Sequence, residues 1–372
     1  MKIKGHHPDY ILIIAVWALA IFGLAILSSA SSELGKVKFD DTYYYLKHQL
    51  FYGFLIGGVG FWLTYKIYYR RLEKLALLLL FLNIAALILV LVSPLGLKIH
   101  GAERWLKIGP ISFQPGEFLK FTFIVYLAVW FGSKLKRRNS FFGGFLPFLI
   151  ISGLIGVLLL LQPSTGTLAI IMAAALAVYF VSGAKLSFIL LTIILGISIL
   201  ATVVYITKDY RLNRISSYLN PASDPQGLGF HTRQSLMAIG SGGIFGVGYG
   251  NSTLKKAGFL PEPIGDSIFA VFAEEFGFVG VISLIAVFLI LLLRGFALAK
   301  TAPDLFAKLF CIGIISIITL QALIHIASVS GIIPFTGLPL PFVSYGGSSL
   351  AILLTSMGVV ANISKYSKKS LI

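Results

Sequence analysis

Apolar runs of about 18 residues or more recur along the whole chain, and they limit the possible folds more than any other feature. Each run is long enough to cross a hydrocarbon core of about 30 Å as a helix. Only 12% of the residues are charged and 57% are apolar, whereas a soluble domain carries roughly 25% charged residues. The chain is therefore expected to be an all-α polytopic membrane protein.

The apolar runs predict a single domain, residues 1–372, built as a bundle of about ten transmembrane helices. The expected spans are residues 10–30, 48–65, 74–93, 116–132, 143–161, 166–183, 186–207, 267–293, 306–329 and 341–363. The fourth of these is short, and only residues 162–165 join the fifth to the sixth, so either place could instead be re-entrant. An even number of crossings puts both termini on one side of the membrane.

Positive charge indicates which side that is. The net charge is +16, which in a membrane protein reports topology before it suggests a nucleic-acid partner, so no nucleic acid is expected. With the termini placed in the cytoplasm, 17 Lys and Arg fall in cytoplasmic segments and 6 in the short loops opposite. Cytoplasmic loops carry the excess of Lys and Arg, so both termini are predicted to be cytoplasmic.

Residues 208–266 form a long segment of mixed polarity between the seventh and eighth spans, on the predicted extracytoplasmic side. Eight glycines lie between Gly227 and Gly250, and helical turns are expected around residues 230–239. The segment is too apolar for a disordered tail and too long for a simple connector. Long loops of this kind usually carry function.

Glu117 and Lys120 draw attention because they lie within or at the edge of a span. A charged side chain at the bilayer centre costs about 2.5–3.5 kcal/mol, so such residues normally face a cavity or a partner. Their spacing of three residues places them on one helical face, where they can pair. The alternative is a helix start, in which Glu117 complements the helix dipole and Lys120 extends outward.

Three further carboxylates lie near the eighth span. Glu274 and Glu275 are adjacent, so they point about 100° apart and cannot both face one cavity. Pro261 and Pro263 predict a stiff extended lead that places Asp266 at the start of the helix. Asp266 is there either an N-cap or a group that accepts a proton.

Other familiar sites are absent. The glycines of residues 240–246 lack the Gly-Lys-Ser/Thr ending of a phosphate loop, and they fit no dinucleotide fingerprint. No two of the six histidines have the spacing of a helical metal site, so no protein metal site is predicted.

Four stretches taken together resemble the SEDS (shape, elongation, division and sporulation) family of membrane proteins. They are Gly101–Trp105 through Gln114–Lys120, Asn220–Pro221 through Gln234–Gly243, Leu260–Pro263 with Asp266, and Pro339–Ser349. The ten-span layout with its long loop also fits this family. The chain departs from the common family pattern at three places, where Ile264-Gly265-Asp266-Ser267 replaces His-Thr-Asp-Phe, Ser164 replaces Asp, and His325 replaces Asn.

The resemblance implies a peptidoglycan glycosyltransferase that polymerises lipid II at the outer face of the bacterial cytoplasmic membrane, for division or elongation. It implies a class B penicillin-binding protein and other divisome or elongasome proteins as partners. Carried over by position, the essential loop aspartate falls on Asp266, and the buried acid and base fall on Glu117 and Lys120. Polar residues of the same motifs, Gln114, Glu262 and Ser344, are expected to line the substrate cavity.

The expected chemistry is an inverting transfer with one general base. A base must take the proton of the acceptor hydroxyl, whereas a diphosphate leaves without needing an acid. The leaving diphosphate needs positive charge, either from the protein or from a divalent cation, Mg²⁺ or Mn²⁺, bound by substrate oxygens. The candidate cations of the outer segments are Arg104, Arg211, Arg214, Arg233, Lys255 and Lys256, which could equally bind lipid headgroups.

Two other functions remain open from the sequence. A lipid II flippase would also use an intramembrane ion pair in a bundle of ten helices. A non-enzymatic scaffold would only activate a class B penicillin-binding protein.

Overall fold

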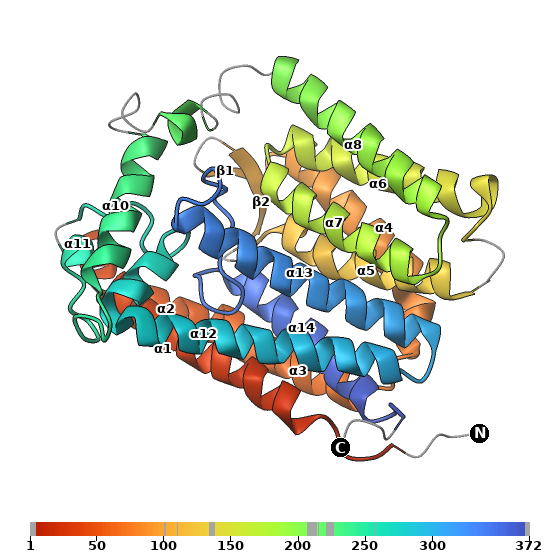
Figure 1. Cartoon of the computed structure of the whole chain (residues 1–372), viewed down its shortest axis with the longest axis horizontal. Coiled ribbons are helices and arrows are strands. Elements are labelled where there is room, and N and C mark those ends of the chain that lie inside the picture. Colours follow the sequence, from red (N-terminus) through yellow and green to blue (C-terminus); the bar gives the residue numbers. More distant parts are fainter. Residues whose placement is uncertain are drawn as a thin grey trace.

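The chain folds as a bundle of long helices, described by a computed structural model over residues 5–99, 102–109, 111–133, 138–206, 214, 216–220, 227–256 and 258–368. Eight helices of this described part are long and apolar enough to cross a membrane. They are α1 (Tyr10–Phe39), α4 (Arg71–Val92), α5 (Pro115–Ser133), α6 (Leu146–Leu161, continuous with the π-helix η3, Phe141–Phe145), α8 (Leu186–Ile206), α12 (Ile268–Thr301), α13 (Leu305–Val329) and α14 (Gly347–Ser364). The bundle is shown in Figure 1.

The two remaining predicted spans are also helical. One coincides with α7 (Thr165–Val181), which has only 17 residues. The other coincides with α2 (Tyr44–His48), the π-helix η1 (Gln49–Leu55) and α3 (Ile56–Lys66), which follow one another without a break. The helical, polytopic fold is thus confirmed, while the number of ten crossings stays a prediction.

The described part of the long segment contains α10 (Leu228–Ser241) and α11 (Thr253–Lys256). The expected helical turns around residues 230–239 are therefore confirmed. Both helices lie at one end of the bundle, beside the start of α12 (Figure 1).

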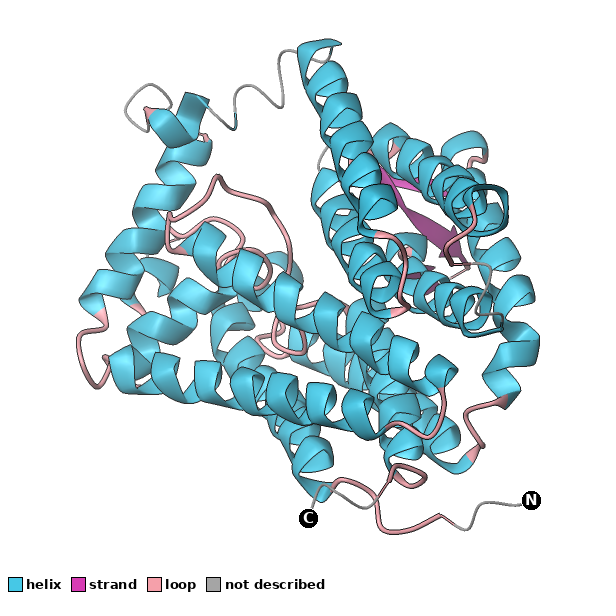
Figure 2. Cartoon of the chain, turned by 45° about the vertical axis from the view of Figure 1, so that its right-hand side comes forward, coloured by secondary structure: helices cyan, strands magenta, loops and turns pink. Residues whose placement is uncertain are grey.

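The connection between α4 and α5 contains a small antiparallel sheet, which the sequence analysis did not predict. Its strands are β1 (Gly96–Ile99), β2 (Ala102–Ile108) and β3 (Ile111–Phe113), in the order β1-β2-β3 (Figure 2, magenta). Leu97 lies opposite Trp105, and Leu106 lies opposite Phe113. These strands are too short to stand out in a sequence dominated by helices, yet they fix the direction of the residues on β2.

Glycines let two helices approach closely where α3 meets α14. A Cβ added at Gly57 would lie 2.9 Å from the Cα of Ala351, and one at Gly358 would lie 2.5 Å from the carbonyl oxygen of Phe61. Small residues at such contacts are typical of helix packing in membranes. The contact holds α14 in the bundle.

The two ends of the described chain meet at one end of the bundle (Figure 1). The His6 N–H donates to the carbonyl oxygen of Lys365 at 2.8 Å, and the Asp9 N–H donates to Ser364 Oγ at 3.0 Å. The Asp9 carboxylate accepts from the Leu12 N–H and pairs with Arg294 at 2.8 Å. Their proximity agrees with an even number of crossings.

Candidate active site

Most of the site residues predicted from the sequence lie around one pocket of about 340 Å³. The predicted residues that line it are Arg104, Gln114, Glu117, Arg214, Glu262 and Asp266. They come from β2, the residue before α5, the first turn of α5, the long segment and the turn before α12. The fold therefore brings together groups that are up to 162 positions apart in the sequence.

Four helices begin at this pocket. Its wall includes Glu117 in the first turn of α5, residues 164–167 at the start of α7, Asp266 just before α12, and Gly346 just before α14. The N-terminus of each helix carries partial positive charge and unpaired N–H groups. Four such ends around one pocket favour the binding of an anion.

Asp266 lies beside Gly337 and Arg214. A Cβ added at Gly337 would lie 3.2 Å from Asp266 Oδ2 and 4.0 Å from Arg214 Nη2. Arg214 Nη1 donates to the carbonyl oxygen of Thr336 at 3.2 Å. Gly337 has φ of +65°, a conformation that suits glycine, so the turn can lie close to the carboxylate.

The approach to Asp266 differs from the predicted extended lead. The N–H groups of Gly265 and Ser267 both donate to the carbonyl oxygen of Glu262 at 3.1 Å, so residues 262–267 form turns. Proline fixes φ near −65°, which suits a turn as well as an extended segment, and Glu262 adopts φ of +45°. Ser267 occupies the N-cap position of α12, so the interpretation of Asp266 as the N-cap is wrong.

Ser344 holds this turn in place instead of lining the pocket. Its Oγ donates to the carbonyl oxygen of Gly265 at 2.8 Å and accepts from the Leu340 N–H at 2.8 Å. The Tyr345 N–H donates to the carbonyl oxygen of Ile264 at 2.9 Å. The expectation that Ser344 faces the cavity is wrong, because both functions of its hydroxyl are directed at backbone groups.

The pair predicted between Glu117 and Lys120 is confirmed. Lys120 Nζ lies 2.6 Å from Glu117 Oε1, and both residues are buried. Lys120 Nζ also donates to Gln321 Oε1 at 2.8 Å, and Gln321 Nε2 donates to the carbonyl oxygen of Pro339 at 2.8 Å. Glu117 lines the pocket, whereas Lys120 lies behind it and connects α5 to α13.

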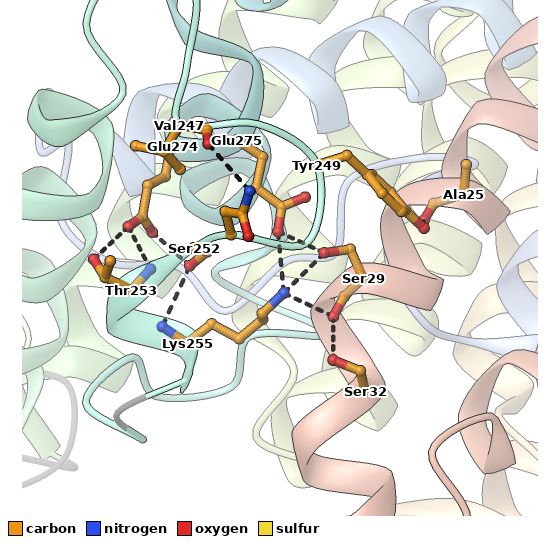
Figure 3. A network of polar contacts seen from close by, with 11 residues as sticks. Ala25, Ser29, Ser32, Val247, Tyr249, Ser252, Thr253, Lys255, Glu274 and Glu275 are labelled. Carbon is orange, nitrogen blue, oxygen red and sulfur yellow. Dashed lines mark hydrogen bonds and ion pairs between the residues drawn. The ribbon is translucent and has the colours of Figure 1, made fainter.

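The side chains of Glu274 and Glu275 bind different groups, as the adjacency of the two residues predicted (Figure 3). Both carboxylates hold the long segment against the bundle. Glu274 accepts from Ser252 Oγ at 2.5 Å and from the N–H and Oγ1 of Thr253 at 2.8 Å. Glu275 accepts from Ser29 Oγ of α1 at 2.5 Å.

Lys255 completes this second set, so its expected role as a cation for diphosphate is wrong. Its Nζ lies 3.0 Å from Glu275 Oε1 and donates to Ser29 Oγ at 2.8 Å, in a buried position (Figure 3). The loop before α11 also pairs with α12 where that helix breaks at Gly277, as in the bond from the Val247 N–H to the Glu274 carbonyl oxygen at 3.0 Å. The network therefore docks the long segment against α1 and α12.

The other candidate cations are placed differently. Arg104 lines the pocket, and its guanidinium donates to the carbonyl oxygens of Gln162, at 3.0 Å, and Pro163. Arg233 lies on α10 and does not line this pocket. Arg211 lies outside the described residues, as does the side chain of Lys256.

One wall of the pocket is formed by residues that the sequence did not indicate as site residues, namely Ser164, Thr165, Gly166 and Thr167 together with residues 336–339. The only available signal was the departure from the family pattern at Ser164. A second pocket of about 650 Å³ adjoins the first and shares Glu262 and Tyr345 with it. Its other lining residues include the apolar side chains of Ile56, Phe113 and Phe118.

Burial also shifts one titratable group next to the site. His231 of α10 lies with Nε2 3.4 Å from Ser267 Oγ and its ring 4.1 Å from that of Phe335. Burial disfavours the charged imidazolium and lowers the pKa of His231 to about 4. The side chain is therefore neutral at physiological pH.

The described residues include no group of three or more His, Cys, Asp or Glu side chains that could hold a metal ion. The described carboxylates of the pocket are Glu117, which pairs with Lys120, Glu262 and Asp266. Two carboxylates with substrate oxygens could share a divalent cation, but they do not make a complete protein site.

Known proteins of one family are similar to this chain over nearly its whole length. The family model described as "Cell cycle protein", labelled for FtsW, RodA and SpoVE, matches residues 10–369. The chain is 39% identical to stage V sporulation protein E of Bacillus subtilis, over 99% of this chain and 100% of that protein. It is also 39% identical to a probable peptidoglycan glycosyltransferase FtsW of Trichlorobacter lovleyi, over 96% of this chain and 93% of that one.

Solved structures agree with these matches over nearly the whole chain. One chain of a structure described as a peptidoglycan synthase complex that coordinates polymerization and crosslinking matches with a TM-score of 0.80 and 29% identity, over 98% of this chain and 99% of that chain. The rod shape determining protein RodA of Thermus thermophilus matches with a TM-score of 0.69 and 29% identity, over 97% and 98% of the two chains.

Proposed function

The chain belongs to the SEDS family of membrane-embedded peptidoglycan glycosyltransferases, and from this we propose that it polymerises lipid II with Asp266 as the general base. The single observation that carries the assignment is the position of this carboxylate, in a pocket where four helices begin and where Arg104 and Arg214 supply positive charge. A base and an anion-binding surface in one pocket are the two things that this transfer needs.

In the proposed reaction, Asp266 takes the proton of a sugar hydroxyl while that oxygen attacks the anomeric carbon of the lipid-linked donor. A new glycosidic bond forms, and the bond from the anomeric carbon to the diphosphate oxygen breaks with inversion. The electron pair leaves with the lipid diphosphate, whose charge the arginines and helix N-termini stabilise. Glu117 lines the pocket and is held by Lys120 behind it, and Ser344 positions the turn that carries Asp266.

The lipid tail of the substrate would lie in the adjoining pocket of about 650 Å³, because apolar side chains line much of it and it shares residues with the first pocket. A polyprenyl chain there would remain next to the membrane while its head group enters the polar pocket. A divalent cation would have only Glu262 and Asp266 as described carboxylates beside substrate oxygens, and Asp266 is already assigned as the base, so the charge on the diphosphate is assigned to the arginines and helix N-termini.

The proposed location is the bacterial cytoplasmic membrane, with both termini in the cytoplasm and the pocket at the outer face. The excess of Lys and Arg on the side of the termini supports this orientation. The proposed partner is a class B penicillin-binding protein, within the machinery of division or elongation. The similarity to a chain from a peptidoglycan synthase complex supports such a partner.

The experiment is to incubate the purified protein with labelled lipid II, with and without a class B penicillin-binding protein, and to separate the products by size. Long glycan strands are expected, and Asp266→Asn should abolish them. Asp40→Asn is the matched control, since Asp40 ends α1 in a left-handed conformation that asparagine tolerates. Normal polymerisation by folded Asp266→Asn protein would refute the base assignment.

The same experiment separates the two rival functions. A flippase, which the buried ion pair of Glu117 and Lys120 would suit, would move lipid II across vesicles without lengthening a glycan. A scaffold would produce no strands alone, and its Asp266→Asn variant would bind and activate the partner normally.

A further inference from the structure

The first turn of α7 presents a set of hydrogen-bond donors to the pocket. Among the described residues, the N–H groups of Thr165, Gly166 and Thr167 have no hydrogen-bond partner, and all three residues line the pocket. Ser164 occupies the N-cap position, is only 7% exposed and also lines the pocket. Its hydroxyl makes no cap bond and has no partner in the described part of the chain.

A buried serine at an N-cap normally accepts a bond from the turn that follows it. Within the described part of the chain, neither the Ser164 hydroxyl nor the three N–H groups make a hydrogen bond, so all of them can bind a ligand in the pocket. The hydroxyls of Thr165 and Thr167 also have no partner within the described ranges, and Thr167 is only 6% exposed. These hydroxyls face the pocket together with the three N–H groups, so the turn presents several hydrogen-bond donors to a ligand in the pocket.

The other three helix starts at the pocket present fewer N–H groups to it or carry negative charge. The Gly346 N–H before α14 donates to Gln49 Oε1 at 2.9 Å. The start of α5 contains Glu117, and Asp266 directly precedes the N-cap of α12. The first turns of α7 and α14 both contain no acidic residue, but only in α7 do all of the first three residues line the pocket, so α7 is the start that best suits an anion.

Arg104 adds a full positive charge next to this turn. Its guanidinium donates to the carbonyl oxygens of Gln162 and Pro163, the two residues before Ser164. On the other side, Gly166 packs against Leu338, where an added Cβ would lie 2.9 Å from the Leu338 Cγ. The turn is thus fixed between β2 and the 336–339 segment that also contacts Asp266.

We propose that residues 164–167 form the binding site for the diphosphate group of the lipid-linked donor, and that this chain holds the diphosphate directly, without a divalent cation. Three N–H groups, three hydroxyls and the charge of Arg104 match the acceptor oxygens of a diphosphate. The inference rests on the proposed function, because it places the leaving group of that reaction. A carboxylate at position 164 would repel the same anion unless a cation lay between them.

The test measures binding of farnesyl diphosphate to the purified chain in EDTA by isothermal titration calorimetry, with inorganic pyrophosphate and farnesyl monophosphate as further probes. Wild-type protein should bind both diphosphates in EDTA and bind the monophosphate at least 10-fold more weakly. Ser164→Asp should weaken the binding of farnesyl diphosphate by at least 10-fold. Ser93→Asp is the matched control, because Ser93 lies in the connection before β1, away from the lining of both pockets, and accepts from the Leu95 N–H as an aspartate could.

An unchanged dissociation constant in folded Ser164→Asp protein would overturn the proposal, as would loss of wild-type binding in EDTA. If Ser164→Asp fails to fold, the double variant Ser164→Ala and Thr167→Val replaces it, with an expected loss of at least threefold. Polymerisation assays distinguish failure of the proposed function from failure of the proposed diphosphate site. Binding without strands would contradict the proposed function only, whereas strands formed by Ser164→Asp with an unchanged KM would contradict the diphosphate site only.

Discussion

Removing the Lys255 ammonium should destabilise the protein more than removing both charges of its buried pair. Lys255 and Glu275 have side chains that are 2% and 0% exposed, with Nζ 3.0 Å from Oε1 (Figure 3). Lys255→Met leaves the Glu275 carboxylate buried with Ser29 Oγ as its remaining described donor. Breaking one partner of a buried pair costs about 3–5 kcal/mol, because the other charge stays desolvated.

The double variant Lys255→Met and Glu275→Met removes both charges, and well-packed apolar replacements of a buried pair are often neutral. We therefore expect its free energy of unfolding to lie within about 1–2 kcal/mol of wild type, since the hydroxyl of Ser29 still needs a partner. The expected coupling energy between the two positions, the difference between the double variant and the sum of the two single variants, is therefore at least about 4 kcal/mol. Glu275→Met alone should resemble Lys255→Met, because it leaves a buried ammonium.

The assay is denaturant unfolding of the purified protein in detergent micelles, combined with limited proteolysis of residues 227–256 to report docking of the long segment. Lys300→Met is the matched control, because it removes an exposed lysine on α12 and should change stability by less than about 0.5 kcal/mol. Additive effects of the two single substitutions in the double variant would refute the reasoning. An unchanged midpoint in Lys255→Met would refute it as well.

Three further substitutions test the site. Gly337→Ala should destabilise the protein by about 1–2 kcal/mol because φ is +65° at this position. It should also lower kcat in the polymerisation assay, because the new Cβ would crowd the proposed base. Gly153→Ala is its control, because no atom lies within 4 Å of a Cβ added there. Lys120→Met should destabilise the protein by about 3 kcal/mol in denaturant unfolding, because it leaves the buried Glu117 carboxylate without its cation. His231 makes stability depend on pH, because its pKa of about 4 in the folded protein lies below the ordinary 6.5. Its contribution to the free energy of unfolding, on the order of 3 kcal/mol, is complete above pH 6.5 and is lost as pH falls toward 4. His231→Asn should therefore flatten the dependence of the unfolding free energy on pH between these values.

Each of these has an outcome that would contradict it. Equal kcat for Gly337→Ala and Gly153→Ala would show that the turn does not restrict the carboxylate. A Lys120→Met protein as stable as wild type would show that the Glu117 carboxylate finds another donor. A pH profile that His231→Asn leaves unchanged would assign the acid sensitivity to other groups.

Local features of the sequence predicted the structure best. The apolar runs coincide with helices because a segment in a bilayer must satisfy its own backbone hydrogen bonds. The pairing of Glu117 with Lys120 follows from a spacing of three on one helix, and the divergence of Glu274 from Glu275 follows from their adjacency. Both could be derived without knowing which helices are neighbours.

Interactions between distant segments could not be predicted in this way. Lys255 looked like a free cation of an outer loop, but it is buried against α1 because the long segment folds back on the bundle. Ser344 belongs to a motif expected at the cavity, yet its hydroxyl binds the backbone of Gly265. The sheet between α4 and α5 decides where Arg104 lies, and its strands are too short to show in the sequence pattern.

The sequence by itself determined a helical membrane protein in which Asp266 lies in a family motif as the expected base. Only the tertiary structure decided that Asp266, Gly337 and residues 164–167 share one pocket with the starts of four helices. The physical reason is that helix formation in a membrane depends on hydrophobicity and hydrogen bonds within a segment. A site built from helix ends depends instead on how the helices pack, and no periodicity along the chain encodes which ends meet.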